Sequence, residues 1–195
     1  MFITKTYSSS AADTDNLAND VTAASGVAFT LITNTTPDSL AHKIIITPSG
    51  SVTGNYTISG IGADGQAVSE TLATNTTNAV TSVGYYMNTI VVTAPSGLGA
   101  NTVDIGWTAA AVTPSINVKP RNRYGFYAIG ISVDATGTPA YSLQQNYGPN
   151  AEWFAHAVIV TKTASEQGSI LFPVNAVRLI FTAASAVQLN LCMPD

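Results

Sequence analysis

Residues 56–72 read Tyr-Thr-Ile-Ser-Gly-Ile-Gly-Ala-Asp-Gly-Gln-Ala-Val-Ser-Glu-Thr-Leu. Apolar and polar side chains alternate on both sides of Asp64-Gly65, which is the pattern of two strands that each bury one face. Asp and Gly together supply the positive φ angles that a tight hairpin turn requires. The stretch therefore predicts an antiparallel β-hairpin that turns at Asp64-Gly65.

The same stretch contains a literal match to the dinucleotide-binding pattern G-x-G-x-x-G, from Gly60 to Gly65. That fingerprint needs a strand before it and a helix after it, because the pyrophosphate contacts the helix N-terminus. An alternating strand follows here. The glycines therefore predict a turn, and we expect no cofactor.

Runs of the same kind recur along the chain roughly every ten residues, separated by Gly, Pro, Asn and Asp, as in antiparallel sandwiches and barrels. We therefore expect an all-β fold. The expected strands are Phe2–Tyr7, Val27–Ile32, Ala41–Thr47, Asn55–Ser59, Ala67–Leu72, Val83–Met87, Thr89–Thr93, Asn101–Trp107, Phe126–Val133, Ala140–Gln145, Ala157–Thr161, Gly168–Phe172, Val177–Thr182 and Val187–Met193.

The segment Thr108–Val118 has no strand alternation and contains Pro114, so we interpret it as a linker. It divides the chain into two tandem antiparallel β-sandwich units, Ig-like or jelly-roll-like, at residues 26–113 and 114–195. Residues 1–25 are expected to form an N-terminal arm or a short helix, since Leu17 and Val21 lie four residues apart.

The two expected units share short sequence similarities. Asn55-Tyr56-Thr57-Ile58 resembles Ala140-Tyr141-Ser142-Leu143, and Met87-Asn88-Thr89-Ile90 resembles Val174-Asn175-Ala176-Val177. A duplicated unit would give this pattern, and so would chance in a chain of biased composition. The sequence leaves both explanations open.

Charge is scarce along the chain. Charged residues make up 9% of the sequence, the net charge is −4, and only 7 residues are Lys or Arg. Nucleic-acid binding relies on Lys and Arg contacts to phosphate, so we expect no such partner. No apolar run approaches the roughly 18 residues of a membrane-spanning helix. The N-terminus lacks the apolar core of a secretory signal, so we expect a cytoplasmic site of synthesis.

Reactive groups are also sparse. Cys192 is the only cysteine, and neither His42 nor His156 lies in a zinc-binding pattern. We expect a half-buried strand histidine at position 42 and an exposed or interface histidine at position 156. The three glutamates lie far apart, whereas acid–base catalysis needs paired carboxylates or a tuned histidine. The pattern favours neither an enzyme nor a metal site.

Two features point to surface contacts. Lys119, Arg121 and Arg123 form the only basic cluster, which suits either an acidic partner or a solvated linker. Arg178 lies in an apolar strand, where it would extend along an edge or pair with a carboxylate. The pair Trp153-Phe154 is of a type enriched at protein interfaces.

Several of these stretches resemble the β-sandwich proteins of tailed-bacteriophage virions. The resemblance rests on residues 56–72, on Tyr-Tyr-Met-Asn-Thr-Ile-Val-Val-Thr-Ala (85–94) and on Val-Asp-Ile-Gly-Trp (103–107). A second pattern runs through Ala-Tyr-Ser-Leu-Gln-Gln-Asn-Tyr (140–147), Trp153 and residues 172–182. These are strand and turn patterns rather than catalytic signatures, and they cover most of residues 55–195.

The resemblance implies a capsid decoration, or cement, protein on the virion surface, which binds the major capsid protein and is commonly a homotrimer. It equally admits a neck, tail or fibre component. A carbohydrate-binding adhesive module is a further alternative, which would need an exposed aromatic such as Trp107 or Trp153 beside Asn or Asp in a shallow groove. The expected partner-binding residues are Phe2, Ile3, Tyr7, Lys119, Arg121 and Arg123.

Overall fold

The computed structural model describes residues 1–74, 77–118, 129–148, 152–171 and 174–193. Every regular element in these ranges is a β-strand, and the strands pair in antiparallel fashion. None of the described segments forms a helix long and apolar enough to cross a membrane. The expected all-β, antiparallel fold is confirmed.

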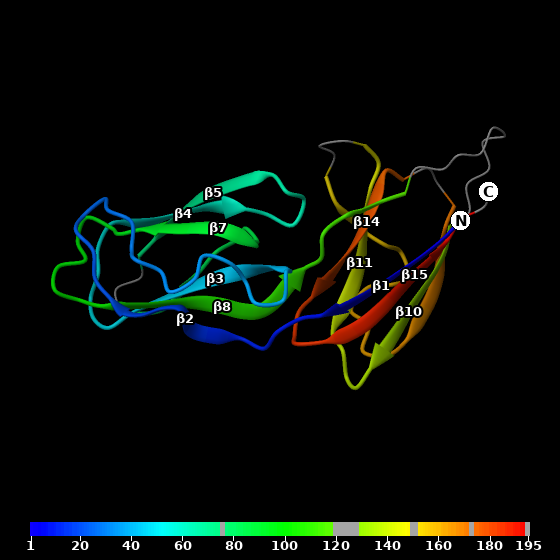
Figure 1. Ribbon diagram of the computed structural model, residues 1–195, viewed down its shortest axis with the longest axis horizontal. Helices are drawn as coiled ribbons and strands as arrows, with labels where there is room; N and C mark the ends of the chain where they lie inside the picture. Colours follow the sequence, from blue (N-terminus) through cyan, green and yellow to red (C-terminus); the bar gives the residue numbers. More distant parts are fainter. Residues whose placement is uncertain (75–76, 119–128, 149–151, 172–173, 194–195) are drawn as a thin grey trace. The chain divides into compact units, whose positions relative to one another are not determined.

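The chain forms two compact units that are nested in sequence (Figure 1). The inserted unit is Ala11–Ala111, and the terminal unit combines Met1–Ser10 with Val112–Asp195. The boundary that we expected after residue 113 lies two residues from the observed one. The expected linker Thr108–Val118 is wrong, because strands Val103–Val112 and Ile116–Asn117 occupy most of it. Residues 1–10, by contrast, belong to the same unit as the C-terminal half of the chain.

The strands of the inserted unit form two sheets. The β8 sheet has the order β2-β8-β3-β6, and the β4 sheet has the order β5-β4-β7. The strands are β2 (Asp13–Val21), β3 (Ala41–Pro48), β4 (Asn55–Ile61), β5 (Ala67–Ala73), β6 (Val80–Thr81), β7 (Asn88–Thr93) and β8 (Val103–Val112).

One apolar cluster joins these two sheets. It takes Ile44 and Ile46 from β3 and Tyr56 and Ile58 from β4, each pair two residues apart on one face of its strand. Burial of this alternating set is the main stabilising term of the unit, since each such side chain contributes about 1.5–3 kcal/mol when removed from water. The other strands add Ile90, Val92, Val103, Ile105 and Trp107.

The predicted hairpin is present. Strands β4 and β5 pair from Asn55↔Ala73 to Ile61↔Ala67. The turn between them holds Gly65 at a φ of +76°, a conformation that suits glycine, and the Asp64 carboxylate accepts a hydrogen bond from the Gln66 amide at 3.0 Å. The residues that we expected to turn the chain therefore do so.

The terminal unit also contains two sheets. The β15 sheet has the order β1-β15-β10-β13, and the β11 sheet joins β12, β11 and β14 in that order, with β9 paired to β14. The strands are β1 (Phe2–Ser8), β9 (Ile116–Asn117), β10 (Ile129–Thr136), β11 (Tyr141–Asn146), β12 (Phe154–Ala155), β13 (Glu166–Ile170), β14 (Ala176–Phe181) and β15 (Ala186–Cys192).

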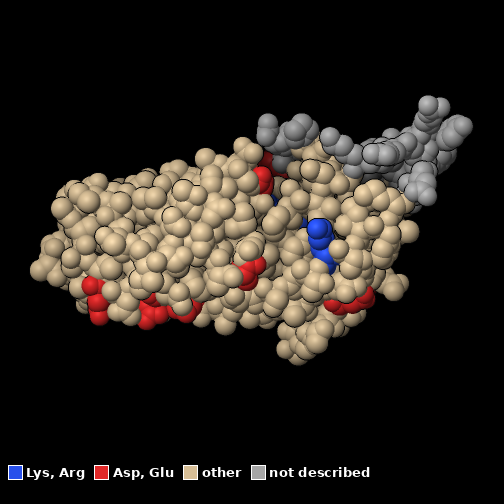
Figure 2. Space-filling view, viewed as in Figure 1, with Lys and Arg blue, Asp and Glu red and all other residues tan. Residues whose placement is uncertain are grey.

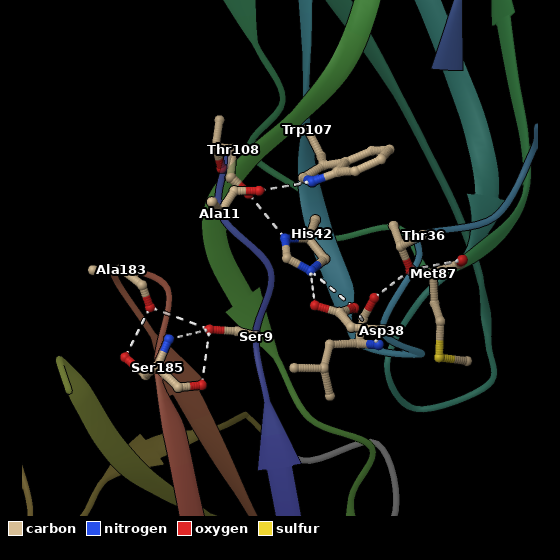
Figure 3. Close-up of polar contacts among 11 residues, drawn as sticks. Ser9, Ala11, Thr36, Asp38, His42, Met87, Trp107, Thr108, Ala183 and Ser185 are labelled. Carbon is tan, nitrogen blue, oxygen red and sulfur yellow. Dashed lines mark hydrogen bonds and ion pairs between the residues drawn. The ribbon is translucent and has the colours of Figure 1, made fainter. Parts of the chain in front are cut away.

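The N-terminal segment differs from the expected arm. Strand β1 pairs with the last strand, β15, from Phe2↔Cys192 to Ser8↔Ala186. Just after β1, the buried Ser9 exchanges two hydrogen bonds with Ser185: its amide donates to the Ser185 carbonyl at 2.8 Å, and its Oγ accepts from the Ser185 amide at 2.9 Å (Figure 3). The first nine residues are thus an integral part of the terminal unit.

The short helix considered for residues 10–24 is also replaced by a strand. Strand β2 pairs with β8 through two register shifts, at partners Asp13↔Trp107, Ala18↔Ile105 and Val21↔Val103. These irregularities let the consecutive residues Leu17 and Ala18 both be buried, which strict strand alternation would not allow. The four-residue spacing of Leu17 and Val21 therefore did not signal a helix.

Three other expected strands are not formed. Val27–Ile32 makes an isolated bridge at Ala28, Val83–Met87 makes one at Tyr86, and Ala157–Thr161 forms no strand. Each run buries one side chain, Phe29, Tyr86 or Ile159, but none extends its pairing into a regular strand. The first part of the expected strand Phe126–Val133 lies outside the described residues.

The two units share one strand order. Strands β2, β8, β3 and β6 correspond to β1, β15, β10 and β13, and β5, β4 and β7 correspond to β12, β11 and β14. The short similarities found in the sequence fall on corresponding strands and in the same register. Ile58 pairs with Val92 where Leu143 pairs with Leu179, and all four side chains are buried. This agreement favours duplication over chance.

Candidate functional site

The structure places the three expected N-terminal contact residues on different faces of β1. Phe2 is 66% exposed. Ile3 and Tyr7 lie on the opposite face and are half-buried, because successive side chains of a strand alternate. Burial raises the pKa of the Tyr7 hydroxyl, against a smaller opposing effect of a hydrogen bond to Thr113. Phe2 is therefore the best exposed of the three.

The three basic residues of the expected contact set, Lys119, Arg121 and Arg123, lie outside the described residues. They remain a prediction. Within the described residues, the most distinctive side-chain grouping is found on the β11 sheet of the terminal unit, around Arg178.

Arg178 in β14 lies opposite Gln144 in β11, and its Nε donates to the Gln144 Oε1 at 2.9 Å. The guanidinium carbon lies 4.1 Å from the centre of the Trp153 ring. This distance is within the range of a cation–π contact. Arg178 therefore contacts an amide and an indole.

Two further aromatic rings lie at the same end of β11. Tyr147 and Phe154 are 49% and 47% exposed, and their ring centres are 5.7 Å apart. The Tyr147 hydroxyl accepts a hydrogen bond from Gln145 Nε2 at 2.8 Å, and Phe154 in β12 is the partner of Gln145 across the sheet. We call Tyr147, Trp153, Phe154 and Arg178 the aromatic cluster; it consists of two contacting pairs at one end of β11, Tyr147 with Phe154 and Trp153 with Arg178.

The composition of the aromatic cluster suits binding rather than catalysis. Trp, Tyr and Arg are the residues most enriched among those that dominate binding energy at protein interfaces. Figure 2 shows few charged side chains on the face of the molecule in view. The described residues contain no group of three or more His, Cys, Asp or Glu that could hold a metal ion.

His42 is fully buried in the inserted unit, deeper than expected. Its Nδ1 lies 2.8 Å from the Thr108 carbonyl oxygen, and its Nε2 lies 2.9 Å from Asp38 Oδ2 (Figure 3). Both partners are oxygen atoms that accept hydrogen bonds. The ring also packs beside Trp107 at 6.4 Å. His42 therefore links β3, β8 and the Asp38 loop as a structural residue.

His156 was expected to be exposed or at an interface, and this is wrong. It is 4% exposed, and its Nδ1 accepts hydrogen bonds from the amides of Val158 and Ile159 at 3.2 and 3.1 Å. Its Nε2 lies 3.2 Å from the Ser169 carbonyl oxygen. The ring thus serves two backbone amides of a segment, residues 157–161, that forms no strand.

Trp107 is not available as a surface ring. It is 3% exposed, and its Nε1 donates to the Ala11 carbonyl at 3.0 Å (Figure 3). Of the two tryptophans named in the sequence, only Trp153 belongs to a partly exposed cluster. The sequence singled out Trp153, Phe154 and Arg178 but not Tyr147 and Gln144. Tyr147 and Gln144 lie at the end of the strand that precedes Trp153-Phe154, and this position could have indicated them.

Comparison with known proteins assigns no family to this chain. No protein-family model matches it, and no curated protein matches it either. The functional interpretation therefore rests on the residues and their geometry.

Proposed function

We propose that this protein is a structural component of a phage virion that binds the outside of the capsid and stabilises the shell. Its partner would be the major capsid protein, and it would act as a homotrimer without catalytic activity. The aromatic cluster is the observation that carries the proposal, since it combines two exposed rings with an arginine held in place by Gln144 and Trp153.

Each unit is proposed to be a β-sandwich, with the β8 and β4 sheets facing each other in one and the β15 and β11 sheets in the other. The shared apolar cluster of the inserted unit supports this. So do the buried inward residues Val133 and Leu189 of the β15 sheet and Leu143 and Leu179 of the β11 sheet. Rigid sandwiches of this kind suit a protein whose task is to present a fixed surface.

The stabilising mechanism is linkage. A protein that binds only the assembled shell lowers the free energy of that state, and the contributions of many copies add. A stable contact of this kind buries about 800 Å² on each partner. Pre-positioning of Arg178 by its two neighbours reduces the side-chain entropy lost on binding.

The first test is the copy number of the chain in purified particles, relative to the major shell protein. A ratio near one copy, or one trimer, per capsomer would support decoration. About six or twelve copies per particle, as a ring in the neck or tail would have, would overturn decoration in favour of that alternative. Absence of the chain from purified particles would overturn both.

The second test uses shells that lack the chain, to which purified protein is added and its occupancy measured by sedimentation. Tyr147→Ala and Trp153→Ala should each weaken binding about tenfold or more, as truncation of a dominant interface residue does. Leu171→Ala is the matched control, because Leu171 is an exposed apolar residue of the same unit outside the cluster. Unchanged occupancy of both cluster variants would reject the aromatic cluster as the docking surface.

A further inference from the structure

A shallow groove of about 300 Å³ lies on the β15 sheet of the terminal unit. All four strands of the sheet line it. Phe2 in β1, Cys192 in β15 and Gly130 in β10 are successive partners across the sheet and form one row. Gly130 has no side chain, so the surface of the sheet is depressed at its position beside the exposed Phe2 ring.

A second row of polar side chains runs beside the first, two residues further along each strand. Thr4, Asn190, Ser132 and Gln167 are successive partners across β1, β15, β10 and β13. They share a face with Phe2, Cys192 and Gly130, since residues two apart in a strand point the same way. With strands about 4.8 Å apart, the row is about 14 Å wide.

Hydrogen bonds fix the centre of this polar row. Asn190 Oδ1 accepts from the Thr4 hydroxyl at 3.0 Å, and Asn190 Nδ2 donates to Asp134 Oδ2 at 2.8 Å. The Ser132 hydroxyl donates to Asp134 Oδ1 at 3.1 Å. The amide and hydroxyl groups are thereby held in place on the surface, where long polar side chains are otherwise free to rotate.

The chemistry of the groove matches a sugar. A sugar ring presents C–H groups on its face, which pack against an aromatic ring, and hydroxyls around its edge, which both donate and accept hydrogen bonds. The groove supplies the Phe2 ring and, beside it, the amide of Gln167 and the oxygen of Ser132, which can still accept a hydrogen bond. Its volume is at the lower limit of about 300–1,000 Å³ for small-molecule sites, so one or two sugar rings would occupy it.

The charge around the groove favours a neutral sugar over an acidic one. Among the described residues, those that line the groove include no Lys or Arg, and the Asp134 carboxylate is bonded to two residues of the lining. A nucleic acid or an acidic sugar would face this carboxylate with no compensating cation. An extended peptide would instead add to a strand edge, where backbone groups are unpaired, rather than lie across paired strands.

We propose that this groove binds a neutral oligosaccharide. The Phe2 ring packs on one face of a sugar, and the Gln167 amide and the Ser132 oxygen bond to its hydroxyls. Asn190, whose amide is already bonded within the protein, holds the polar row in place. The site is on the sheet opposite to that of the aromatic cluster, and it does not depend on the proposed role in a capsid. A protein anchored through the aromatic cluster would keep this groove available.

Gly130 offers a sharp test, because its environment tolerates a side chain. A Cβ at this position would meet the Cβ of Cys192 at 3.6 Å, which is ordinary van der Waals contact, and the φ of Gly130 is not in the left-handed region. Valine also favours strands. Gly130→Val should therefore leave the fold intact while it fills the depression beside Phe2.

The experiment applies the full chain to an array of neutral and acidic oligosaccharides, including N-acetylated, sialylated and uronic-acid types. The best-bound neutral oligosaccharide is then titrated by calorimetry into the parent protein and three variants. We expect Phe2→Ala and Gly130→Val to weaken binding at least tenfold. Tyr147→Ala, which removes an aromatic ring of similar exposure from the aromatic cluster, should change it less than twofold.

Several outcomes would overturn the proposal. These are no binding to any neutral oligosaccharide, tighter binding to the acidic ones, or full binding by Gly130→Val with an unchanged melting temperature. Loss of shell occupancy in Gly130→Val without any oligosaccharide binding would show that the groove contacts protein instead. Loss of shell occupancy in Tyr147→Ala alone would support the capsid role and leave the oligosaccharide result to be judged separately on its own titration.

Discussion

Replacing Tyr56 with phenylalanine should stabilise the inserted unit. The Tyr56 side chain is fully buried, and its hydroxyl has no hydrogen-bond partner within the described residues. A buried polar group without a partner carries a desolvation penalty of about 1–3 kcal/mol. Phenylalanine removes that penalty and keeps the ring that packs beside Phe29 at 6.5 Å. We expect the free energy of unfolding to rise by about 1 kcal/mol.

Tyr141 provides the matched control, because it occupies the corresponding place in β11 of the terminal unit. It is equally buried, but its hydroxyl donates to the Ala164 carbonyl at 2.7 Å. Tyr141→Phe removes this hydrogen bond and should lower the stability of the terminal unit by about 1 kcal/mol. The same chemical change is therefore expected to have opposite signs in the two units.

The chain has 2 tryptophans, and each unit contains one, Trp107 or Trp153. Urea unfolding followed by fluorescence in Trp153→Phe and Trp107→Phe backgrounds therefore reports the two units separately. A change of 1 kcal/mol should move the midpoint by about 0.3–1 M urea. If Tyr56→Phe unfolds at lower urea than its parent, the hydroxyl is satisfied in the folded protein and the reasoning is refuted.

Three further predictions concern stability. Burial raises the pKa of Tyr56 and of Tyr141 to about 12, above the ordinary value of 10.0. Between these values only the unfolded state loses the protons, so stability should fall from pH 10 to 12 by on the order of 2–3 kcal/mol for each residue, and circular dichroism should show less loss in Tyr56→Phe. Ser9→Ala should lower the stability of the terminal unit by about 1–2 kcal/mol in urea, because the Ser185 amide loses its acceptor; an unchanged midpoint would contradict this. Asp38→Asn weakens the contact to His42 and should lower the melting temperature, by about 4–8 °C for each kcal/mol of stability lost; an unchanged melting temperature would contradict this.

Local sequence patterns were sufficient where a structural element depends on adjacent residues. The hairpin was predictable because Asp64-Gly65 has few alternatives to a turn and because the flanking strands alternate strictly. The similarity around Tyr56 and Tyr141 was also informative, since both residues occupy the same buried position of corresponding strands. In each case the signal and the structure lie within a few residues of one another.

Pairings between distant residues were not predictable in this way. Strand β1 was expected within an arm because its own seven residues contain no buried core: only Ile3 and Tyr7 face inward, and both remain half-buried. What makes it a strand is β15, whose first residue, Ala186, follows Ser8 by 178 positions. No pattern inside the N-terminal segment records that partner.

The candidate sites also combine residues that the sequence could indicate with contacts that depend on distant strand pairings. Trp153 and Arg178 could be singled out as residue types that favour interfaces, but their contact at 4.1 Å depends on the pairing of β11 with β12 and β14. Phe2 could be proposed from the sequence as a contact residue. The groove beside it could not, because Gly130 and Asn190 enter it only through the order of strands in the β15 sheet.

The nesting of the two units is compatible with efficient folding because of how the inserted unit ends. Its first and last strands, β2 and β8, pair at Asp13↔Trp107, so the unit brings its own two ends together. Once it has folded, the loop that separates β1 from the rest of the terminal unit is short in effect, and the entropy lost on pairing β1 with β15 falls accordingly. An insertion whose ends lie close together is the kind that domains tolerate. The pairing of the first and last strands, which both units have, thus explains why one unit can lie inside the other.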